Sequence, residues 1–252
     1  MNKKICRFLS ATTALVLPSY LACKILNLLG HKLASDCRLG FSLVLTDRLL
    51  MQSGARIGHL NLININRLVM RKDAYIGRTN IINGPIDIVL DEKGAIGNRN
   101  KIIRAPLGVT SGKATLRLGK LAKITADHLI DCTQSIHIGH YSTIAGMGTQ
   151  IWSHGYIHET SGSDRYRIDG KVRIGDNVYI GASCIISMGV NIVDGVIVGA
   201  GATVARNLDE AGLYVSSALR KLPRPLAPEA RSDLMKSTDE QLCERVYLKK
   251  KC

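Results

Sequence analysis

Aromatic residues are scarce in this sequence. Phe, Tyr and Trp make up 4% of the 252 residues, with one Trp and two Phe, whereas 24 residues are Gly. The hydrophobic fraction is still 46%, which is ample for a core. A core of this composition relies on Ile, Val and Ala, so the sequence favours a narrow interior between tight corners over a bulky globular core.

Paired cysteines are also lacking. The seven Cys are an odd number and no two of them form a C-x-x-C pair. This usage supports neither a disulfide framework nor a zinc ribbon. We therefore predict no metal site, and the cytosol, where thiols stay reduced, is the simplest compartment.

Acidic residues are in the minority. Asp and Glu number 20 against 34 Lys and Arg, which gives a net charge of +14. A charge of this size predicts an anionic partner. Aromatic residues are not interleaved with the basic ones and no nucleic-acid-binding motif is present, so we expect phosphorylated ligands and a membrane surface, and no nucleic acid.

The strongest pattern is a six-residue period between residues 172 and 209. An aliphatic side chain returns at Ile174, Ile180, Ile186, Ile192, Val198 and Val204. A second apolar and mostly small series lies four residues after each of these, at Val178, Cys184, Val190, Val196, Ala202 and Leu208. The position between the two series is Gly or Asn in five of the six repeats, and both residue types tolerate positive φ.

Two inward side chains separated by one outward residue predict a short strand, and the Gly/Asn position predicts a sharp corner. Such a unit cannot bury its own apolar face, so successive repeats must stack as a parallel β-helix solenoid. An ordinary parallel sheet is excluded because its crossover connections need about a dozen residues.

The segment IGDNVYIGASCIISMGVNIVDGVIVGAGATV closely resembles the C-terminal coils of the hexapeptide-repeat acyltransferases. The resemblance implies an all-β fold, a left-handed parallel β-helix with three hexads per turn. It extends in weaker form toward the N-terminus, so we expect the solenoid to span residues 35–215. A basic C-terminal extension, residues 216–252, follows, and we expect a solvated tail there with at most one short helix around residues 233–246.

The earlier repeats are less regular. Ile-Gly or Leu-Gly pairs begin at Ile57, Ile76, Ile96, Leu118 and Ile138, at intervals slightly longer than three hexads. We expect each early turn to carry a few extra residues at a corner. Asparagines recur in the same region, at Asn61, Asn64, Asn66, Asn80, Asn83, Asn98 and Asn100. Corner positions are the expectation for them, with stacking between turns as the alternative.

Residues 1–34 form an apolar N-terminal segment. A basic start, KKICR, precedes an uncharged run from Phe8 to Cys23, which is shorter than the about 20 residues of a spanning helix and is interrupted by Pro18. A signal peptide is the competing interpretation, but apolar residues continue beyond Lys24. We expect two short helices that meet near Pro18 and either rest on the inner face of the membrane or cap the first coil.

The repeat pattern breaks after His154 and returns at Val172. Residues 155–171 are rich in Gly, Asp, Arg and Tyr and predict a loop extruded between two coils. In the acyltransferases that the sequence resembles, a histidine before such a loop is the general base. The match falls on His154, with His158 as its rival.

General-base catalysis suits this residue type. An imidazole titrates near neutral pH and can take the proton of a sugar hydroxyl while the oxygen attacks a thioester carbonyl. A backbone N–H at a glycine corner can then stabilise the oxyanion. Glu159 and Asp164 are the candidates to orient the imidazole, and the sequence does not choose between them.

Several residues around the loop are candidates for substrate binding. Trp152 is expected either to stack on a sugar face or to pack beneath the loop. Four basic residues are expected either to contact the phosphates of a nucleotide- or lipid-linked glycan or to be merely solvated, and they are Arg165, Arg167, Lys171 and Arg173.

The resemblance also implies acetyl-CoA as the donor, bound in a groove between neighbouring subunits of a homotrimer. Small residues of the last coils would let the pantetheine arm approach, or they are simply corner residues. They are Gly181, Ala182, Gly199, Ala200 and Gly201. Basic residues beyond them would hold the phosphates of CoA, and these are Arg206, Arg220 and Lys221.

These features predict an acetyl-CoA-dependent O-acetyltransferase that modifies a saccharide in surface polysaccharide or glycolipid synthesis. Its expected location is the cytoplasm, in solution or peripherally on the inner face of the membrane. The alternatives are an N-acetyltransferase that acts on an amino sugar, a non-catalytic scaffold, and a solenoid carbonic anhydrase. The last would hold zinc with three histidines from among His137, His140, His154 and His158.

Overall fold

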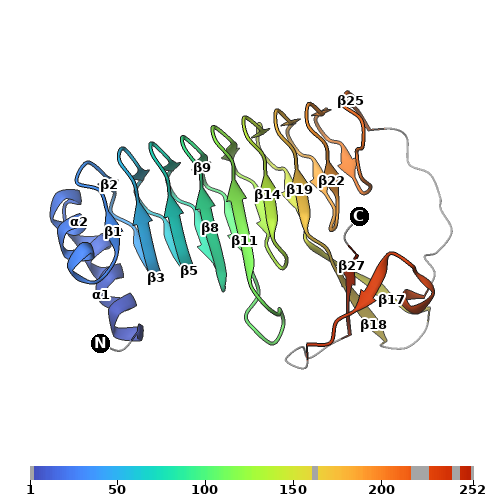
Figure 1. Cartoon of the computed structure of the whole chain (residues 1–252), viewed down its shortest axis with the longest axis horizontal. Helices are drawn as coiled ribbons and strands as arrows, with labels where there is room; N and C mark the ends of the chain where they lie inside the picture. Colours follow the sequence, from blue (N-terminus) through green and yellow to red (C-terminus); the bar gives the residue numbers. More distant parts are fainter. Residues whose placement is uncertain (1–2, 161–163, 217–226, 240–244, 251–252) are drawn as a thin grey trace.

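The computed structural model describes residues 3–160, 164–216, 227–239 and 245–250. These residues form a long parallel β-helix, with two helices at its N-terminal end and a small sheet beside its last coils (Figure 1). The predicted all-β solenoid is confirmed.

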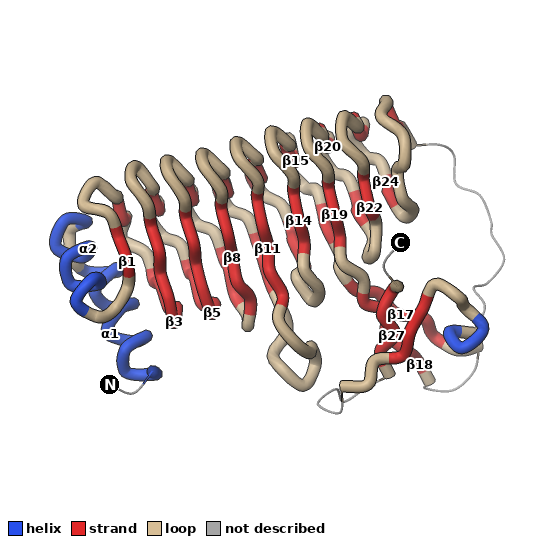
Figure 2. The backbone as a smooth tube through the Cα atoms, viewed as in Figure 1, coloured by secondary structure: helices blue, strands red, loops and turns tan. Residues whose placement is uncertain are grey.

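The solenoid has three faces, each built from strands of successive coils (Figure 2). The first face comprises β3 (Leu43–Met51), β5 (Leu62–Met70), β8 (Ile86–Leu90), β11 (Ala114–Leu118), β14 (Ile136–Ile138), β19 (Val172–Ile174) and β22 (Asn191–Ile192), with β1 (Lys32–Leu33) at its edge. The second comprises β7 (Ile81–Asn83), β10 (Lys101–Ile103), β13 (Leu129–Asp131), β16 (Gln150–Ile151), β21 (Ile185–Ile186) and β24 (Thr203–Val204). The third comprises β2 (Arg38–Leu39), β4 (Arg56–Ile57), β6 (Tyr75–Ile76), β9 (Ala95–Asn98), β12 (Lys123–Ala126), β15 (Thr143–Ile144), β20 (Tyr179–Ile180), β23 (Ile197–Val198) and β25 (Leu213–Tyr214). The long strand β5 takes part in two faces, because its first residues pair with β7 and its last with β8.

The core lies along the axis and is filled by aliphatic side chains from all three faces. Both predicted inward series of residues 172–209 are buried, each side chain at 5% exposure or less. Four of the predicted corners have positive φ, between 54° and 73°, and Ser183 adopts the same conformation. Asn207 does not, and its Oδ1 instead accepts the N–H of Asn191 at 3.0 Å.

The register of the early coils differs from the expectation. Ile57, Ile76 and Ile96 stack on the third face, where the next partner is Ile124. Leu118 lies on the first face instead, paired with Leu90. The reason is a loop of residues 104–113 between β10 and β11, which shifts the Ile-Gly series from one face to another.

Three of the recurring asparagines stack between turns, at one corner. The backbone N–H and the Nδ2 of Asn80 both donate to Oδ1 of Asn61 at 2.9 Å. The N–H of Asn100 donates to Oδ1 of Asn80 at 2.8 Å, and the N–H of His128 donates to Oδ1 of Asn100 at 3.0 Å. All four residues are buried, so their side chains form a continuous ladder inside the corner.

The two predicted N-terminal helices are present. Helices α1 (Lys3–Val16) and α2 (Ser19–Leu28) meet at Pro18 and cover the end of the solenoid, with Ala14, Ala22 and Leu26 buried in the core (Figure 1). In the described part of the chain, no helix is long and apolar enough to cross a membrane.

The segment expected to be a loop is a β-hairpin. Strands β17 (His154–His158) and β18 (Arg165–Asp169) pair antiparallel, and they leave the solenoid at the corner between the second and first faces. The loop of residues 104–113 leaves from the same corner of an earlier coil (Figure 1). Two insertions therefore project on one side of the molecule.

The expectation of a solvated C-terminal tail with a helix is wrong for the described residues. After a short 3₁₀ helix, η1 (Pro228–Ala230), the chain forms β26 (Leu234–Lys236) and β27 (Val246–Lys249). Strand β27 pairs parallel with β18, and β26 pairs antiparallel with β27. Leu234 and Tyr247 are buried against Tyr166 and Ile168 of the hairpin, so apolar contact fixes this segment.

Candidate active site

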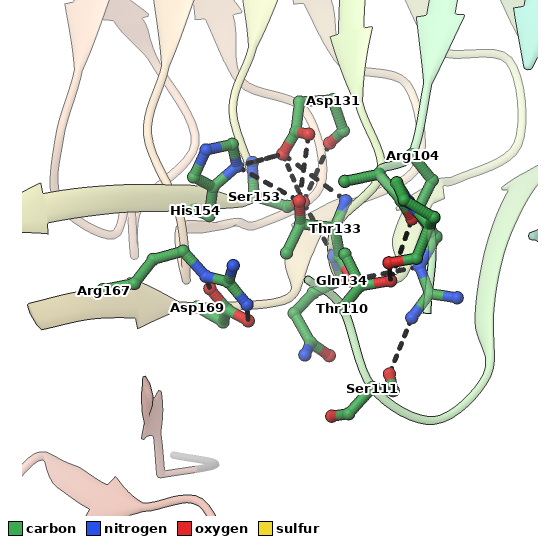
Figure 3. Close-up of polar contacts among 12 residues, drawn as sticks. Arg104, Thr110, Ser111, Asp131, Thr133, Gln134, Ser153, His154, Arg167 and Asp169 are labelled. Atoms are coloured by element: carbon green, nitrogen blue, oxygen red, sulfur yellow. Dashed lines mark hydrogen bonds and ion pairs between the residues drawn. The ribbon is translucent and has the colours of Figure 1, made fainter. Parts of the chain in front are cut away.

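The centre of the site is a contact between His154 and Asp131. Nδ1 of His154 lies 2.9 Å from Oδ2 of Asp131 and 3.1 Å from Oγ1 of Thr133 (Figure 3). Asp131 ends β13 and His154 opens β17 one coil later, so the stacking of coils brings them together. The contact occupies Nδ1 and leaves Nε2, which bonds none of the described residues, as the nitrogen for chemistry.

The Asp131 carboxylate is held in its ionised form. It is 3% exposed and accepts hydrogen bonds from the Ser153 N–H at 3.1 Å, the Ser153 hydroxyl at 3.0 Å and the Thr133 hydroxyl at 3.0 Å. Burial raises the pKa of Asp131, but the bonds from His154 and Ser153 outweigh it, so the pKa lies below the usual value. An ionised acceptor at Nδ1 fixes the tautomer and stabilises an imidazolium when Nε2 takes a proton.

Two aromatic rings flank the imidazole. The rings of Trp152 and Tyr156 each stand edge-on to His154 with centroids 5.9 Å away. Trp152 is fixed by its own Nε1–H, which donates to Oε1 of Gln150 at 2.9 Å. The guanidinium of Arg165 lies 5.2 Å from the centre of the Tyr156 ring. Trp152 therefore limits the positions open to the His154 imidazole. Arg165 contacts Tyr156, which in turn contacts His154.

The second buried pair of the site is Arg167 with Asp169. Both side chains are almost fully buried, and Nε of Arg167 lies 2.7 Å from Oδ1 of Asp169. Asp169 stands opposite His154 in the hairpin register. Burial raises the pKa of Asp169, which Arg167 counteracts only in part. Arg167 thus does not present the exposed charge expected of a phosphate contact.

Another buried cation closes the site from the other side. Arg104 donates to the carbonyl oxygens of Pro85 at 2.7 Å, Ser111 at 2.6 Å and Thr133 at 3.4 Å (Figure 3). These bonds tie the loop of residues 104–113 to the coil that carries Asp131. The pKa of Arg104 is lowered by burial.

The predicted orienting acids do not reach the imidazole. The N–H of Glu159 donates to the carbonyl of Asp164 at 3.1 Å at the tip of the hairpin, and the Asp164 carboxylate pairs with Arg245. Asp131 takes the role instead, and the prediction of Glu159 or Asp164 is wrong. His158, the rival base, is exposed, faces Arg165 across the hairpin and bonds no described side chain.

The candidate donor residues lie at another corner of the solenoid. Gly181 and Ala182 follow β20, and Gly199, Ala200 and Gly201 follow β23 directly above them. A Cβ on Gly181 would stand 2.7 Å from the Ala200 nitrogen, so close stacking of coils already requires that glycine. Arg206 is exposed after β24, whereas Arg220 and Lys221 lie outside the described residues. This corner lies between the third and second faces, whereas His154 lies at the corner between the second and first.

The basic residues of the hairpin return have a different environment. Lys171 and Arg173 are exposed, and both line a cavity beside the hairpin. Across the described ranges, no group of three or more His, Cys, Asp or Glu is arranged to hold a metal ion.

Comparison with known proteins agrees with the repeats. Residues 171–206 match the family described as the hexapeptide repeat of succinyl-transferase. Over 126 residues the sequence is 36% identical to the putative acetyltransferase YvoF of Bacillus subtilis (strain 168). The chain is therefore similar to hexapeptide-repeat acyltransferases. The YvoF match covers 50% of this chain and 66% of YvoF, just under two thirds of that relative's length.

One solved structure is also similar to part of the chain. It is that of a point mutant of AntD, an N-acyltransferase from Bacillus cereus, in complex with dTDP and coenzyme A. The identity is 20%, the match covers 60% of this chain and 83% of AntD, and the TM-score is 0.27.

Proposed function

We propose that this protein transfers an acetyl group from acetyl-CoA to a hydroxyl group of a saccharide, with Nε2 of His154 as the general base. The observation that carries the proposal is the contact of His154 with the ionised Asp131 at the corner where the hairpin leaves the solenoid. Similarity to hexapeptide-repeat transferases supports the class of reaction, acyl transfer.

The reaction needs one proton carrier. Nε2 of His154 takes the hydroxyl proton as the acceptor oxygen forms a bond to the thioester carbonyl carbon. The tetrahedral intermediate then collapses, the carbon–sulfur bond breaks, and the imidazolium returns its proton to the leaving thiolate. Asp131 stabilises the imidazolium between these steps.

We further propose a homotrimer in which the donor lies between subunits. The donor corner at Gly181 and Gly199 and the His154 corner are separated within one chain, so a neighbouring copy must bring them together. Exposed apolar side chains of the last coils support such an interface, because Tyr179, Ile185 and Ile197 are each at least 40% exposed in the single chain.

A peripheral membrane contact is the third part of the proposal. The outer side of α1 carries Ile5, Phe8, Leu9, Leu15 and Val16, which are all exposed and fall on one side of a helix with 3.6 residues per turn. On α2 the exposed apolar residues are Tyr20, Leu21 and Leu28. Neither helix contains Asp or Glu, and Lys24 of α2 is exposed. Arg7 of α1 faces the solenoid instead, where it pairs with Asp47 at 3.2 Å. An apolar face beside an exposed cation suits an anionic bilayer surface.

Replacement of His154 tests the catalytic proposal. We expect His154→Ala to lower the turnover of acetyl-CoA with a saccharide panel by about 10²- to 10⁴-fold, measured as release of the CoA thiol. His158→Ala is the matched control and should keep turnover within about twofold, because His158 is exposed at the far end of the same strand. Unchanged turnover in His154→Ala would remove the assignment.

A further inference from the structure

A cavity of about 520 Å³ lies beside the catalytic hairpin. Its lining comes from two parts of the chain, the last coils with Arg173, Val190 and Asn191, and β27 with Leu248 and Lys249. The return of the C-terminal chain to β18 therefore contributes to the cavity.

The walls of this cavity carry an unbalanced positive charge. Its basic residues are Lys171, Arg173, Lys249 and Lys250, and its single acid is Asp169. Asp169 is already bound to Arg167, at 2.7 Å. None of the four cations has an ion-pair partner among the residues that the structure describes. Asp233, an acid near Lys249, is not among the lining residues and pairs with Arg231 at 2.8 Å.

The cavity adjoins the reacting centre. Asp169 is both part of the cavity wall and the residue opposite His154 in the hairpin. A ligand that fills the cavity therefore lies one cross-strand pair away from the proposed base. Concave basic walls that mix lysine and arginine bind phosphate well, because Lys supplies point charges and Arg a planar pair of donors. The apolar contacts of Val190 and Leu248 suit the organic part that carries the phosphate.

We propose that this cavity binds a phosphate or diphosphate group of one of the two substrates, with Arg173 of the last coils and Lys249 of β27 as its main contacts. That the ligand is a substrate rests on the proposed function. Two substrates carry such a group, a phosphorylated acceptor and acetyl-CoA with the phosphates of CoA. The location near His154 is compatible with either.

Binding of inorganic pyrophosphate to the full chain tests the cavity without turnover. By isothermal titration at low salt, the double variant R173Q/K249Q should bind pyrophosphate at least about tenfold more weakly than the unmodified protein, because it lacks two charged contacts to the anion. The control K101Q/K123Q removes the same charge from exposed lysines of β10 and β12, outside the cavity, and should bind within about twofold. Equal weakening in both variants, or absence of pyrophosphate binding, overturns the proposal.

Inhibition of turnover then identifies the source. If the cavity holds the CoA phosphates, pyrophosphate competes with acetyl-CoA, and R173Q/K249Q raises the KM for acetyl-CoA but not for acetyl-pantetheine. If it holds the acceptor, pyrophosphate does not compete with acetyl-CoA and the variant leaves that KM unchanged. Both patterns support the cavity as a phosphate site. Should turnover fail while pyrophosphate still binds through Arg173 and Lys249, the proposed reaction falls and the site stands.

Discussion

The carboxylate of Asp131 binds the imidazole of His154 on its Nδ1 side, at 2.9 Å, although the two residues belong to different coils. Neighbouring coils of a β-helix are linked by strand pairing, here β13 with β16, so the distance between these residues is fixed by the solenoid and not by the flexible end of a loop. The solenoid therefore holds a carboxylate against His154, the proposed base, at the point where the hairpin begins.

Loss of the Asp131 charge should impair catalysis more than binding. We expect Asp131→Asn to lower kcat by about 10²- to 10⁴-fold with little change in KM, because an amide cannot stabilise the imidazolium. In a His154→Ala background the same substitution should have almost no further effect on kcat. Additive losses in the double variant would show that Asp131 does not act through His154.

Stability should depend on Asp131 in acid. Its pKa is lower in the folded protein than in the unfolded chain, so the folded state binds fewer protons and the stabilising contribution is present above about pH 4 and lost as pH falls through the folded pKa. Asp169, with a raised pKa, contributes in the opposite direction. Urea unfolding of the unmodified protein and Asp131→Asn should give a difference in unfolding free energy that shrinks from neutral pH to about pH 3. A constant difference would contradict this linkage.

The regular coils were predictable from sequence because each hexad contains the residues that define its strand and its corner. Ile174, Ile180 and Ile186 recur at a period that only a stacked solenoid explains, and their burial follows. The position of His154 was predictable for a related reason, since it marks the break in the same period.

The partners of His154 were not predictable in this way. Asp131 is the last residue of β13, and the register of β13 with β16 places it beside the hairpin. The signal available in the sequence was the acidic residue that ends the otherwise apolar segment LID. The sequence carried even less signal for the C-terminal strand β27. Its partner, β18, is distant in the sequence, and the composition around β27 resembles that of a solvated tail.

The contribution of the asparagine ladder to the stability of the fold can be tested at Asn80. Asn80 donates to Asn61 Oδ1 and to the carbonyl of Gly97, at 2.8 Å, and accepts the N–H of Asn100. Asn80→Ala leaves these buried groups unpaired, at about 1–3 kcal/mol each, so we expect at least about 2 kcal/mol of lost unfolding free energy in urea. Asn66→Ala, at an exposed position of β5, is the control and should change it by no more than about 0.5 kcal/mol. Similar losses at both positions would mean that the ladder contributes no special stability.

The apolar side of α1 and α2 makes a test of membrane contact. Phe8 and Leu28 are 64% and 86% exposed, and burial of two such side chains in a bilayer is worth about 3 kcal/mol or more in total. We expect the protein to co-sediment with vesicles that contain phosphatidylglycerol, and F8S/L28S to bind at least about tenfold more weakly. The control L107S/L213S changes two residues that are similarly exposed, 59% and 67%, but lie away from the helices. It should bind like the unmodified protein, and turnover should be unchanged in F8S/L28S because Phe8 and Leu28 belong to the helices at the N-terminal end of the solenoid. Equal sedimentation with neutral and anionic vesicles would show that positive charge on the helices takes no part in binding. Failure to sediment with either kind of vesicle would refute the membrane contact and favour a protein partner for the apolar face.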